Sequence, residues 1–180
     1  MLKNTAISYG IVAKTFHWLL LLMLASSIVM GNLLAALPKG PEKLQAAGMH
    51  KSFGALLLAL ILLRLLWRLI NETPKLPDST TMVQAILAKG MHGVLYLLMF
   101  LQPLSGILMS QAGGIPVSVF GLFEFPILLD KNPGLAELAR SIHRAVWILL
   151  VLATLGHVGA ALHHHFIKKD HVLKQMTFGK

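Results

Sequence analysis

Four long apolar runs, separated by short polar or broken stretches, dominate the pattern of the chain. They cover residues 16–37, 46–70, 91–110 and 141–167. Each is close to or longer than the roughly 20 residues that an α-helix needs to cross the hydrocarbon core of a bilayer. The pattern therefore predicts an all-α fold, an integral membrane four-helix transmembrane bundle with both termini on the same side.

The connecting stretches differ in character. PKGPEK at 38–43 joins the first two runs, and its prolines and glycine predict a tight reversal. Residues 71–90 begin as a proline-containing loop, for which we predict a change to helix ahead of the third span. Residues 111–134 are half apolar but broken by Gly and Pro, which predicts a loop lying on the membrane surface. We find no internal repeat, so residues 1–180 are expected to form a single domain.

Composition supports a membrane protein and narrows its chemistry. Hydrophobic residues make up 56% of the 180 residues and charged residues 13%, with a mean hydropathy of +0.70, which is too apolar for an ordinary soluble domain. There is no cysteine, which excludes disulfides, thiolate-ligated haem and iron–sulfur ligation by this chain. Any metal must therefore depend mainly on histidine. The first apolar run has the length of a span and no cleavage pattern follows it, so we expect it to remain as a span.

The formal net charge of +9 could suggest nucleic-acid binding. The Lys and Arg residues, however, cluster at the ends of the apolar runs, where they anchor and orient spans, so no nucleic-acid partner is expected. The termini and the second connector carry ten Lys and Arg against three acidic residues, a tally that includes Asp78 and Lys180. The other side carries six against four. The positive-inside rule therefore places both termini in the cytoplasm.

Nine histidines are unexpected in so apolar a chain, because ionisable groups at membrane depth are costly and usually mark function. His143 and His157 are fourteen residues apart in the fourth run. Fourteen residues turn a helix through about 1400°, which leaves the two imidazoles about 40° apart on one face, and climb roughly 21 Å. That distance is too long for one shared metal ion, but it suits two sites stacked across a membrane.

Two further histidines match these in depth, because alternate spans run in opposite directions. His17, near the cytoplasmic start of the first span, is expected at the level of His157, and His50, near the outer start of the second, at the level of His143. Two histidine pairs at two depths are what two bis-histidine haems require. Two alternatives stay open: any single histidine could simply hydrogen-bond a neighbouring helix, or the set could form the zinc or proton path of a transporter.

Several longer stretches resemble one protein family. They are FHWLLLLML at 16–24, MHKSFG at 49–54, RLLWRL at 64–69, MHGVLYLLMFLQPLSG at 91–106 and IHRAVWILLVLATLGHVGAALHHHFIKKD at 142–170. Together they span nearly the whole chain, which on these motifs resembles the bacterial cytochrome b561 family and most closely its small four-span, superoxide-oxidising branch. The resemblance implies two b-type haems held by His17, His50, His143 and His157 in the bacterial inner membrane.

The same resemblance implies an activity. Electrons from superoxide at the periplasmic face would pass through the two haems to ubiquinone in the membrane. The alternative is an electron-carrier subunit that links a hydrogenase or another dehydrogenase to the quinone pool. A protein partner is thus compatible with the chain but not required, and the lack of a large soluble domain or a fifth span favours the stand-alone enzyme.

Other residues are candidates at the cytoplasmic end. Arg64 follows His50 by fourteen residues, so it shares that face at the depth of His17, where a guanidinium could bind a haem propionate or a quinone. His164, seven residues beyond His157, keeps to the same face and is the leading quinone contact. His92 opens the third span and is a second candidate contact to haem or quinone. His163 and His165 are expected at the interface and His171 in solvent; Arg68 is expected to extend to the interface.

At the outer end, cations flank the expected outer haem. Lys51 follows His50 directly, Arg140 lies three residues before His143 and Arg144 one residue after it. Cations there could draw in an anionic substrate such as superoxide, and we predict such a role for Lys51 and Arg140. They could equally neutralise haem propionates or dock a protein partner.

Overall fold

The computed structural model describes residues 1–77 and 79–178. Asp78 and Lys180, which enter the charge tally above, lie outside the described residues. The elements in chain order are α1 (Ile11–Ala36), α2 (Pro41–Leu69), α3 (Met82–Ala112), β1 (Val117–Val119), β2 (Phe123–Phe125), α4 (Pro133–His163), the π-helical turn η1 (His164–Lys168) and the 3-10 turn η2 (Lys174–Met176).

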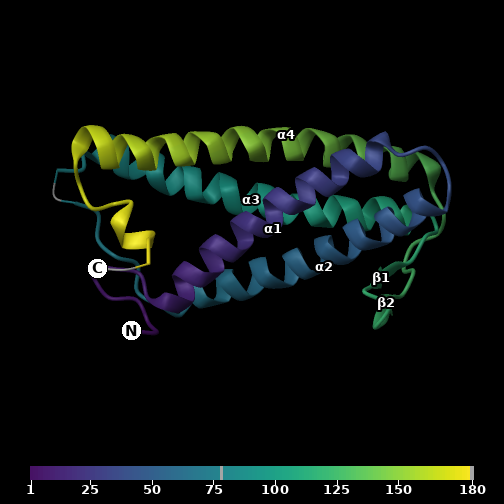
Figure 1. Ribbon diagram of the computed structural model, residues 1–180, viewed down its shortest axis with the longest axis horizontal. Coiled ribbons are helices and arrows are strands. Elements are labelled where there is room, and N and C mark those ends of the chain that lie inside the picture. The colour runs from purple at the N-terminus through teal and green to yellow at the C-terminus, as the bar shows by residue number, and fades with distance from the viewer. Residues whose placement is uncertain (78, 179–180) are drawn as a thin grey trace.

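All four long helices are long and apolar enough to cross a membrane, which confirms the predicted helical membrane fold. Both chain ends and the α2–α3 connection lie at one end of the bundle, here called the terminal end (Figure 1). The α1–α2 connection and the β1–β2 hairpin lie at the opposite end, here called the hairpin end (Figure 1).

Local sequence explains where the helices begin. Thr81 and Gln84 form a reciprocal capping box at the start of α3, which satisfies two backbone N–H groups of the first turn. Asn132 accepts a hydrogen bond from the N–H of Leu135 at the start of α4, and Pro133 fills the first helical position. The capping box begins α3 nine residues ahead of the predicted third span, which agrees with the predicted change to helix within this connector; that helix runs into the span without a break.

The stretch expected as a surface loop contains a short antiparallel hairpin instead. Val117 pairs with Phe125, Ser118 with Glu124, and Val119 with Phe123. Residues 120–122 form its tip. Phe120 and Gly121 both have positive φ, 53° and 72°, a conformation that Gly121 adopts without steric cost. The alternation V-S-V and F-E-F has the period of two that strands require, and this signal lies within the Gly- and Pro-rich stretch.

The buried core forms one apolar layer across the middle of the bundle. Each helix contributes two side chains: Leu20 and Met23, Leu57 and Ile61, Leu98 and Met99, and Val146 and Leu150. Ile61 at the centre has 0% of its surface exposed. On each helix these positions fall between the polar residues of the two ends, so the layer separates the bundle into two polar levels.

The four helices do not pack equally closely. The backbones of α3 and α4 approach most extensively, followed by α1 with α2 and then α2 with α3. Over the described residues, neither α1 with α4 nor α2 with α4 forms a comparable backbone contact. Side chains that meet between these more distant helices therefore have room around them.

The C-terminal segment folds back across the terminal end (Figure 1). Lys169, in the left-handed conformation, ends η1 and reverses the chain. The indole N–H of Trp18 donates to the carbonyl of Met176 at 2.9 Å, and the side-chain amide of the buried Gln175 donates to the carbonyl of Lys75 at 3.3 Å. The segment is thus fixed to both α1 and the α2–α3 connection.

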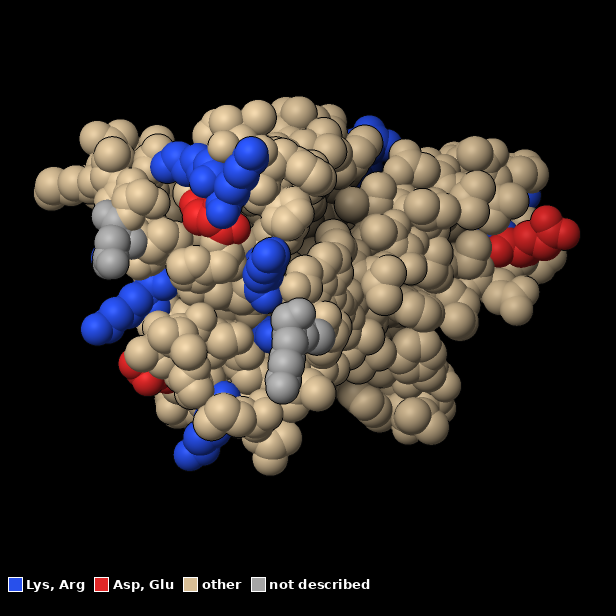
Figure 2. Space-filling view, turned by 60° about the vertical axis from the view of Figure 1, so that its left-hand side comes forward, with Lys and Arg blue, Asp and Glu red and all other residues tan. Residues whose placement is uncertain are grey.

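Charged side chains are distributed as a membrane requires. In Figure 2, Lys and Arg gather toward the terminal end, and uncharged surface covers the broad middle of the visible face. Many leucines of the helices are exposed in that middle region, among them Leu63, Leu149 and Leu152. Exposed apolar side chains around the middle of a bundle are expected where lipid is the solvent.

Candidate haem-binding site

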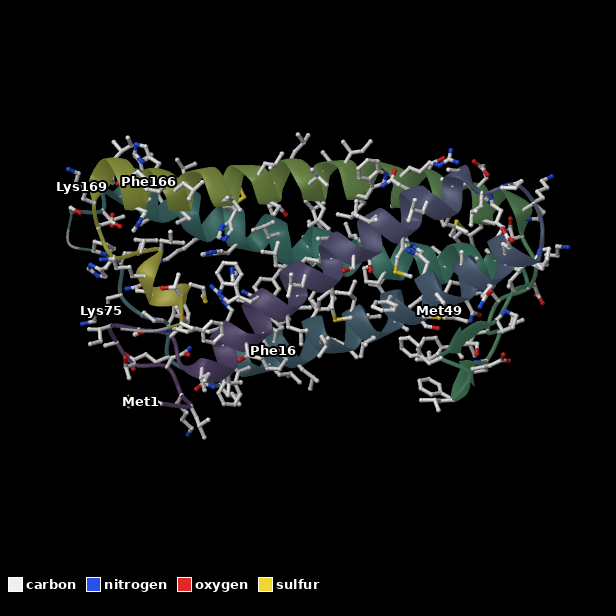
Figure 3. The ribbon with its side chains drawn as sticks, in the orientation of Figure 1. Met1, Phe16, Met49, Lys75, Phe166 and Lys169 are labelled. Atoms are coloured by element: carbon white, nitrogen blue, oxygen red, sulfur yellow. The ribbon has the colours of Figure 1, made fainter. Side chains whose placement is uncertain are left out.

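Four histidines form two pairs between α4 and the two helices that do not pack closely against it. His17 of α1 and His157 of α4 form the terminal pair, with ring centroids 6.2 Å apart. His50 of α2 and His143 of α4 form the hairpin pair, also with centroids 6.2 Å apart. Phe16 and Met49, the residues that precede His17 and His50, lie at separate levels along the bundle (Figure 3).

The separation within each pair suits a bis-histidine iron. A metal–nitrogen bond of about 2.0 Å on each side, plus about 1.1 Å from the nitrogen to its ring centroid, places two ligating imidazoles about 6 Å apart. Fourteen residues of α4, or roughly 21 Å, separate the two levels. The structure therefore brings together the histidines that helical geometry selected, as two matched pairs.

Hydrogen bonds of the hairpin pair also fit haem ligation. His143 Nδ1 lies 2.9 Å from the backbone carbonyl of Gln102, to which it donates, so its Nε2 carries the lone pair. In the structure this lone pair accepts from the side-chain amide of Gln102 at 3.0 Å, which would have to turn away when Nε2 binds a metal. Metal-binding histidines commonly donate their second N–H to a carbonyl in this way, which fixes the ring and its tautomer. Ser105 Oγ, 3.0 Å from the same nitrogen, also faces the ring. His50 Nδ1 is buried with no hydrogen-bond partner among the described residues.

Two glycines leave space beside the hairpin pair. A Cβ on Gly31 of α1 would come within 3.2 Å of His50 Cε1, and a Cβ on Gly106 of α3 within 3.2 Å of His143 Cε1. Each helix passes its histidine at a distance that only glycine permits without displacement. The hairpin pair is thus set in a cradle that larger residues would fill, and these residues fit a b-type haem.

His92 of α3 joins the terminal pair as a third imidazole. Its ring centroid lies 5.4 Å from that of His157, so distance alone would also allow His92 as the partner of His157. However, α3 packs closely along α4, whereas α1 does not. A flat macrocycle needs space between the two helices that supply its ligands, and this favours His17 as the second ligand.

Two arginines of α2 lie at the terminal level. Arg64 Nη2 is 3.1 Å from His17 Nδ1, and a guanidinium has only donors, so the imidazole nitrogen accepts. The guanidinium carbons of Arg64 and Arg68 lie 5.7 and 5.6 Å from the ring centroid of Tyr96. Arg68, expected to extend to the interface, is thus half-buried against an aromatic ring. Within the described chain, no carboxylate forms an ion pair with either arginine.

Tyr9 adds a phenol to this end, just before α1. Burial raises the pKa of the Tyr9 phenol above its usual range, and the nearby Arg68 and Arg64 oppose the rise only in part. The phenol therefore stays protonated at neutral pH. It is a hydrogen-bond donor close to the two arginines.

His164, the leading quinone candidate, lies in η1 and is paired with an acid. Its Nδ1 is 2.5 Å from Asp170 Oδ2. Burial would raise the pKa of Asp170, but hydrogen bonds from the His164 imidazole and the N–H of Val172 outweigh it and hold that pKa below its usual value of 3.8. The carboxylate is thus ionised at neutral pH and orients the imidazole, with Nε2 on the opposite side of the ring.

The cations predicted near the outer ligands have partners in the structure. Lys51 donates from Nζ to the carbonyl of Pro116 at 3.0 Å and to Ser110 Oγ at 3.4 Å. Arg140 forms an exposed ion pair with Glu137, with Nε and Oε2 3.1 Å apart. Arg144 is exposed on α4. All three lie toward the hairpin end, but Lys51 also ties the segment ahead of β1 to α2.

The other histidines are less engaged. His163 and His171 are exposed, and His165 is half-buried with its Nδ1 unpaired among the described residues. Across residues 1–77 and 79–178, no three His, Asp or Glu side chains are arranged to hold one metal ion.

Sequence reasoning missed several polar residues of these levels. Tyr96 lies four residues after His92, so it shares a helix face with a residue already selected. Arg68, four residues after Arg64, was considered from the sequence but was assigned to the interface. Gln102 and Ser105 interrupt an apolar run three residues apart, which is itself a signal of function at membrane depth. Asp170 had no such signal, because only the reversal at Lys169 brings it back to His164.

A four-helix membrane bundle with paired histidines on facing helices defines the class of membrane electron-transfer proteins that bind b-type haem. Comparison with known proteins agrees. Residues 8–179 match the family described as prokaryotic cytochrome b561, and the chain belongs to this family.

Individual relatives give further detail. The chain is similar to cytochrome b561 homolog 2 of Escherichia coli K12, at 36% identity over 96% of this chain and 93% of that protein. It is 29% identical to cytochrome b561 homolog 1 of the same organism, over 89% and 91%. A Yersinia pestis protein named "Probable superoxide oxidase CybB" is 28% identical over 93% and 94%. The protein is therefore a membrane electron-transfer cytochrome.

Proposed function

We propose that this protein is a superoxide oxidase that binds two b haems and passes electrons from superoxide at the periplasmic face to ubiquinone. In this proposal the hairpin end faces the periplasm of a bacterial inner membrane and the terminal end faces the cytoplasm, as the positive-inside rule indicates. Two histidine pairs at two levels, both using α4, carry the two-haem part of the proposal. The cations Arg140 and Arg144 near His143 favour an anionic electron donor.

The stoichiometry of the reaction balances. Two superoxide anions each lose one electron and become dioxygen, and ubiquinone takes up those two electrons with two protons to become ubiquinol. Bound b haems supply the reversible one-electron chemistry. The chain positions them and excludes water between the levels, through the apolar layer around Ile61 and Leu150.

At the hairpin end, the chain would hold one haem and attract the anion. His50 and His143 supply the ligating nitrogens, and the Gln102 carbonyl fixes the His143 ring. Arg140 and Arg144 add positive charge close to His143, although Glu137 offsets part of it. Cations near a reactive centre raise the local concentration of an anionic substrate and speed its arrival.

At the terminal end, Arg64 would respond to ligation of His17. If Nε2 of His17 binds iron as a neutral imidazole, the ring proton is on Nδ1 and faces the guanidinium, so Arg64 must turn to another acceptor. A haem propionate is such an acceptor, and the half-buried Arg68 could bind a second one. This role explains why two half-buried arginines at the terminal level have no carboxylate partner in the described chain.

His164 is the proposed proton donor to quinone. Asp170 accepts from its Nδ1, so the ring donates from Nε2 to a quinone carbonyl only in its doubly protonated form. After that proton has moved to the quinone, Nε2 can be reprotonated from the cytoplasmic side. His92, whose ring adjoins that of His157, is the second candidate contact. Both residues lie on the terminal side of the apolar layer, where the second electron carrier would be.

The names of the relatives are compatible with either function considered from the sequence. The Yersinia relative is named a probable superoxide oxidase, whereas the more similar Escherichia coli relative is named only for the family. An electron-carrier subunit for a hydrogenase or another dehydrogenase would use the same two histidine pairs. The two functions differ in whether the isolated protein reacts with superoxide.

The test mixes purified, haem-loaded protein with superoxide and a short-chain ubiquinone and follows haem reduction and ubiquinol formation. We expect rapid haem reduction, with a rate that falls as salt shortens the Debye length from about 10 Å at 0.1 M to about 3 Å at 1 M. Arg140→Glu should slow it further. Lys39→Glu, which makes the same charge change on the α1–α2 connection at the same end, should have a smaller effect.

Two outcomes would contradict the proposal. If protein that retains its haems is not reduced by superoxide, the carrier function replaces the enzyme. If it is reduced but Arg140→Glu and Lys39→Glu are indistinguishable, the cations beside His143 do not guide the substrate.

A further inference from the structure

The β1–β2 hairpin is an amphipathic element with no assigned role. Directly opposed residues of an antiparallel pair point to the same face. One face therefore carries Val117, Val119, Phe123 and Phe125, and the other carries Ser118 and Glu124. Val117 and Val119 are buried, and β1 packs on α2. Glu124, the only charged residue of the hairpin, lies on the opposite face.

The tip and the segment that follows expose large apolar side chains. Leu122 at the tip is 82% exposed, Phe123 is 53% exposed, and Leu128 after β2 is 80% exposed. Figure 1 shows the hairpin beside the outer part of α2, on the side of the bundle away from α4. Their exposure shows that these side chains are not packed into the bundle.

The hairpin is held firmly in this position. Ser52 Oγ accepts from the N–H of Phe120 at 3.0 Å. Its one proton faces two carbonyls, that of Ser118 at 3.0 Å and that of Gly48 in its own helix at 2.9 Å. Lys51 donates to the carbonyl of Pro116, and the rings of Phe53 and Phe120 meet edge to face at 5.7 Å. Three consecutive residues after His50 thus fix the hairpin to α2.

The depth of the hairpin follows from its contacts with α2. If Arg68 marks one boundary of the hydrocarbon core, a thickness of about 30 Å extends roughly twenty residues along the helix, to about residue 48. Ser52 then lies about one turn inside the opposite boundary. The hairpin beside it is at the border between hydrocarbon and headgroups.

Two costs confine it to that border. Deep in the hydrocarbon, the unpaired edges of two three-residue strands would leave backbone groups without partners. In water, Leu122, Phe123 and Leu128 would be exposed to solvent without compensation. At the border, the backbone and Glu124 can reach water while the tip and the phenyl rings enter the acyl chains.

We infer that the β1–β2 hairpin is an interfacial anchor whose apolar tip, Leu122 and Phe123, inserts into the lipid leaflet at the hairpin end. The partner of this surface is the lipid leaflet, not a second copy of the chain. Lys51, Ser52 and Phe53, which hold the anchor, directly follow His50 in α2. The anchor therefore fixes the depth of the hairpin pair relative to the membrane surface. This inference rests on the shown membrane fold and is independent of superoxide chemistry.

The absence of native cysteine makes a site-specific test direct. Leu122→Cys, Phe123→Cys and Glu124→Cys are each labelled with a nitroxide in the full, haem-loaded chain and placed in lipid nanodiscs. Collision rates with oxygen, which concentrates in lipid, and with a water-soluble nickel chelate are measured by power saturation. Leu149→Cys on α4 serves as the lipid reference, and Glu137→Cys at the exposed start of α4 as the aqueous reference.

We expect the labels at 122 and 123 to favour oxygen as the 149 label does, and the label at 124 to favour the chelate as the 137 label does. Chelate preference at all three positions would overturn the anchor. Dipolar broadening at 122 with low access to both reagents would replace lipid with a second copy as the partner.

A second measurement tests the connection to α2. Ser52→Ala removes its hydrogen bonds to Ser118 and Phe120 of the hairpin, together with one to Gly48 within α2. The spectrum of the 122 label should become more mobile. Ser26→Ala is the matched control, because its hydroxyl bonds only within α1, to the carbonyl of Leu22. Equal mobility in the two variants would contradict a hairpin fixed through Ser52.

Discussion

Alanine at Gly31 or Gly106 would place a methyl group against one histidine of the hairpin pair. In both cases the added carbon would lie 3.2 Å from the imidazole Cε1, whereas carbon atoms in comfortable contact are about 3.5–4.0 Å apart. The ring must then move by roughly 0.3–0.8 Å, or the helices must separate. Either change misplaces a ligating nitrogen whose bond to a metal tolerates only about 0.2 Å.

The energetic cost can be bounded. Overpacking by one methyl group costs about 1–3 kcal/mol of folding free energy. Replacing glycine with alanine inside a helix stabilises the helix by about 0.8–1.0 kcal/mol. The net loss is about 0–2 kcal/mol, which at its upper end corresponds to a roughly thirtyfold weaker haem affinity at the hairpin level. The terminal level, roughly 21 Å away along α4, should keep its haem.

The assay is haem content per chain by pyridine haemochrome, together with the reduced spectrum and the thermal midpoint. Gly90→Ala is the matched control, because Gly90, like Gly106, is in α3 but is exposed and has open space where the Cβ would go. We expect Gly90→Ala to keep its haems and Gly31→Ala and Gly106→Ala to lose the hairpin-level haem selectively. If both keep the haem content, spectrum and midpoint of Gly90→Ala, the glycine cradle is not part of the site.

Two further predictions concern the terminal end. His164→Ala should leave both haem bands intact but slow electron transfer to added quinone, measured by stopped flow. His163→Ala is the control, because His163 is the exposed neighbour. Equal rates in the two variants would remove His164 from the quinone site. Asp170→Ala should lower the thermal midpoint at pH 7, because the depressed pKa of Asp170 means that its ionised form stabilises the fold. This contribution to stability is present above pH 3.8, the usual pKa of the group, and is lost as the pH falls through the lower pKa of the folded state. The difference in thermal midpoint between Asp170→Ala and the unmodified protein should therefore shrink below pH 3.8. A difference that does not change with pH would contradict the ion pair.

Helical periodicity explains how much of this protein is accessible from its sequence. The four spans follow from run length alone, and the step from His143 to His157 fixes one face of α4 without any knowledge of the neighbouring helices. Arg64 is found in the same way, and the structure places it 3.1 Å from His17. These features depend on one helix at a time, which is why a sequence can specify them.

Features that need a tertiary reversal were not accessible. Residues 111–134 were expected as a loop because their Gly and Pro residues outweighed the short V-S-V and F-E-F alternation. Three-residue strands acquire their stability only by packing, here on α2. The pairing of His164 with Asp170 needs the left-handed turn at Lys169. The presence of His92 beside His157 required the side-by-side packing of α3 and α4, which spacing within either helix does not reveal.

The central claim, two haem levels held by two histidine pairs, is tested most directly by counting haems in the purified protein and in two variants. We predict two b haems per chain in the unmodified protein, and one in each of His50→Ala and His17→Ala, with different remaining spectra because a different level survives. Helical content by circular dichroism should be unchanged in both. A single haem in the unmodified protein, or a folded His50→Ala protein that still binds two, would contradict the account.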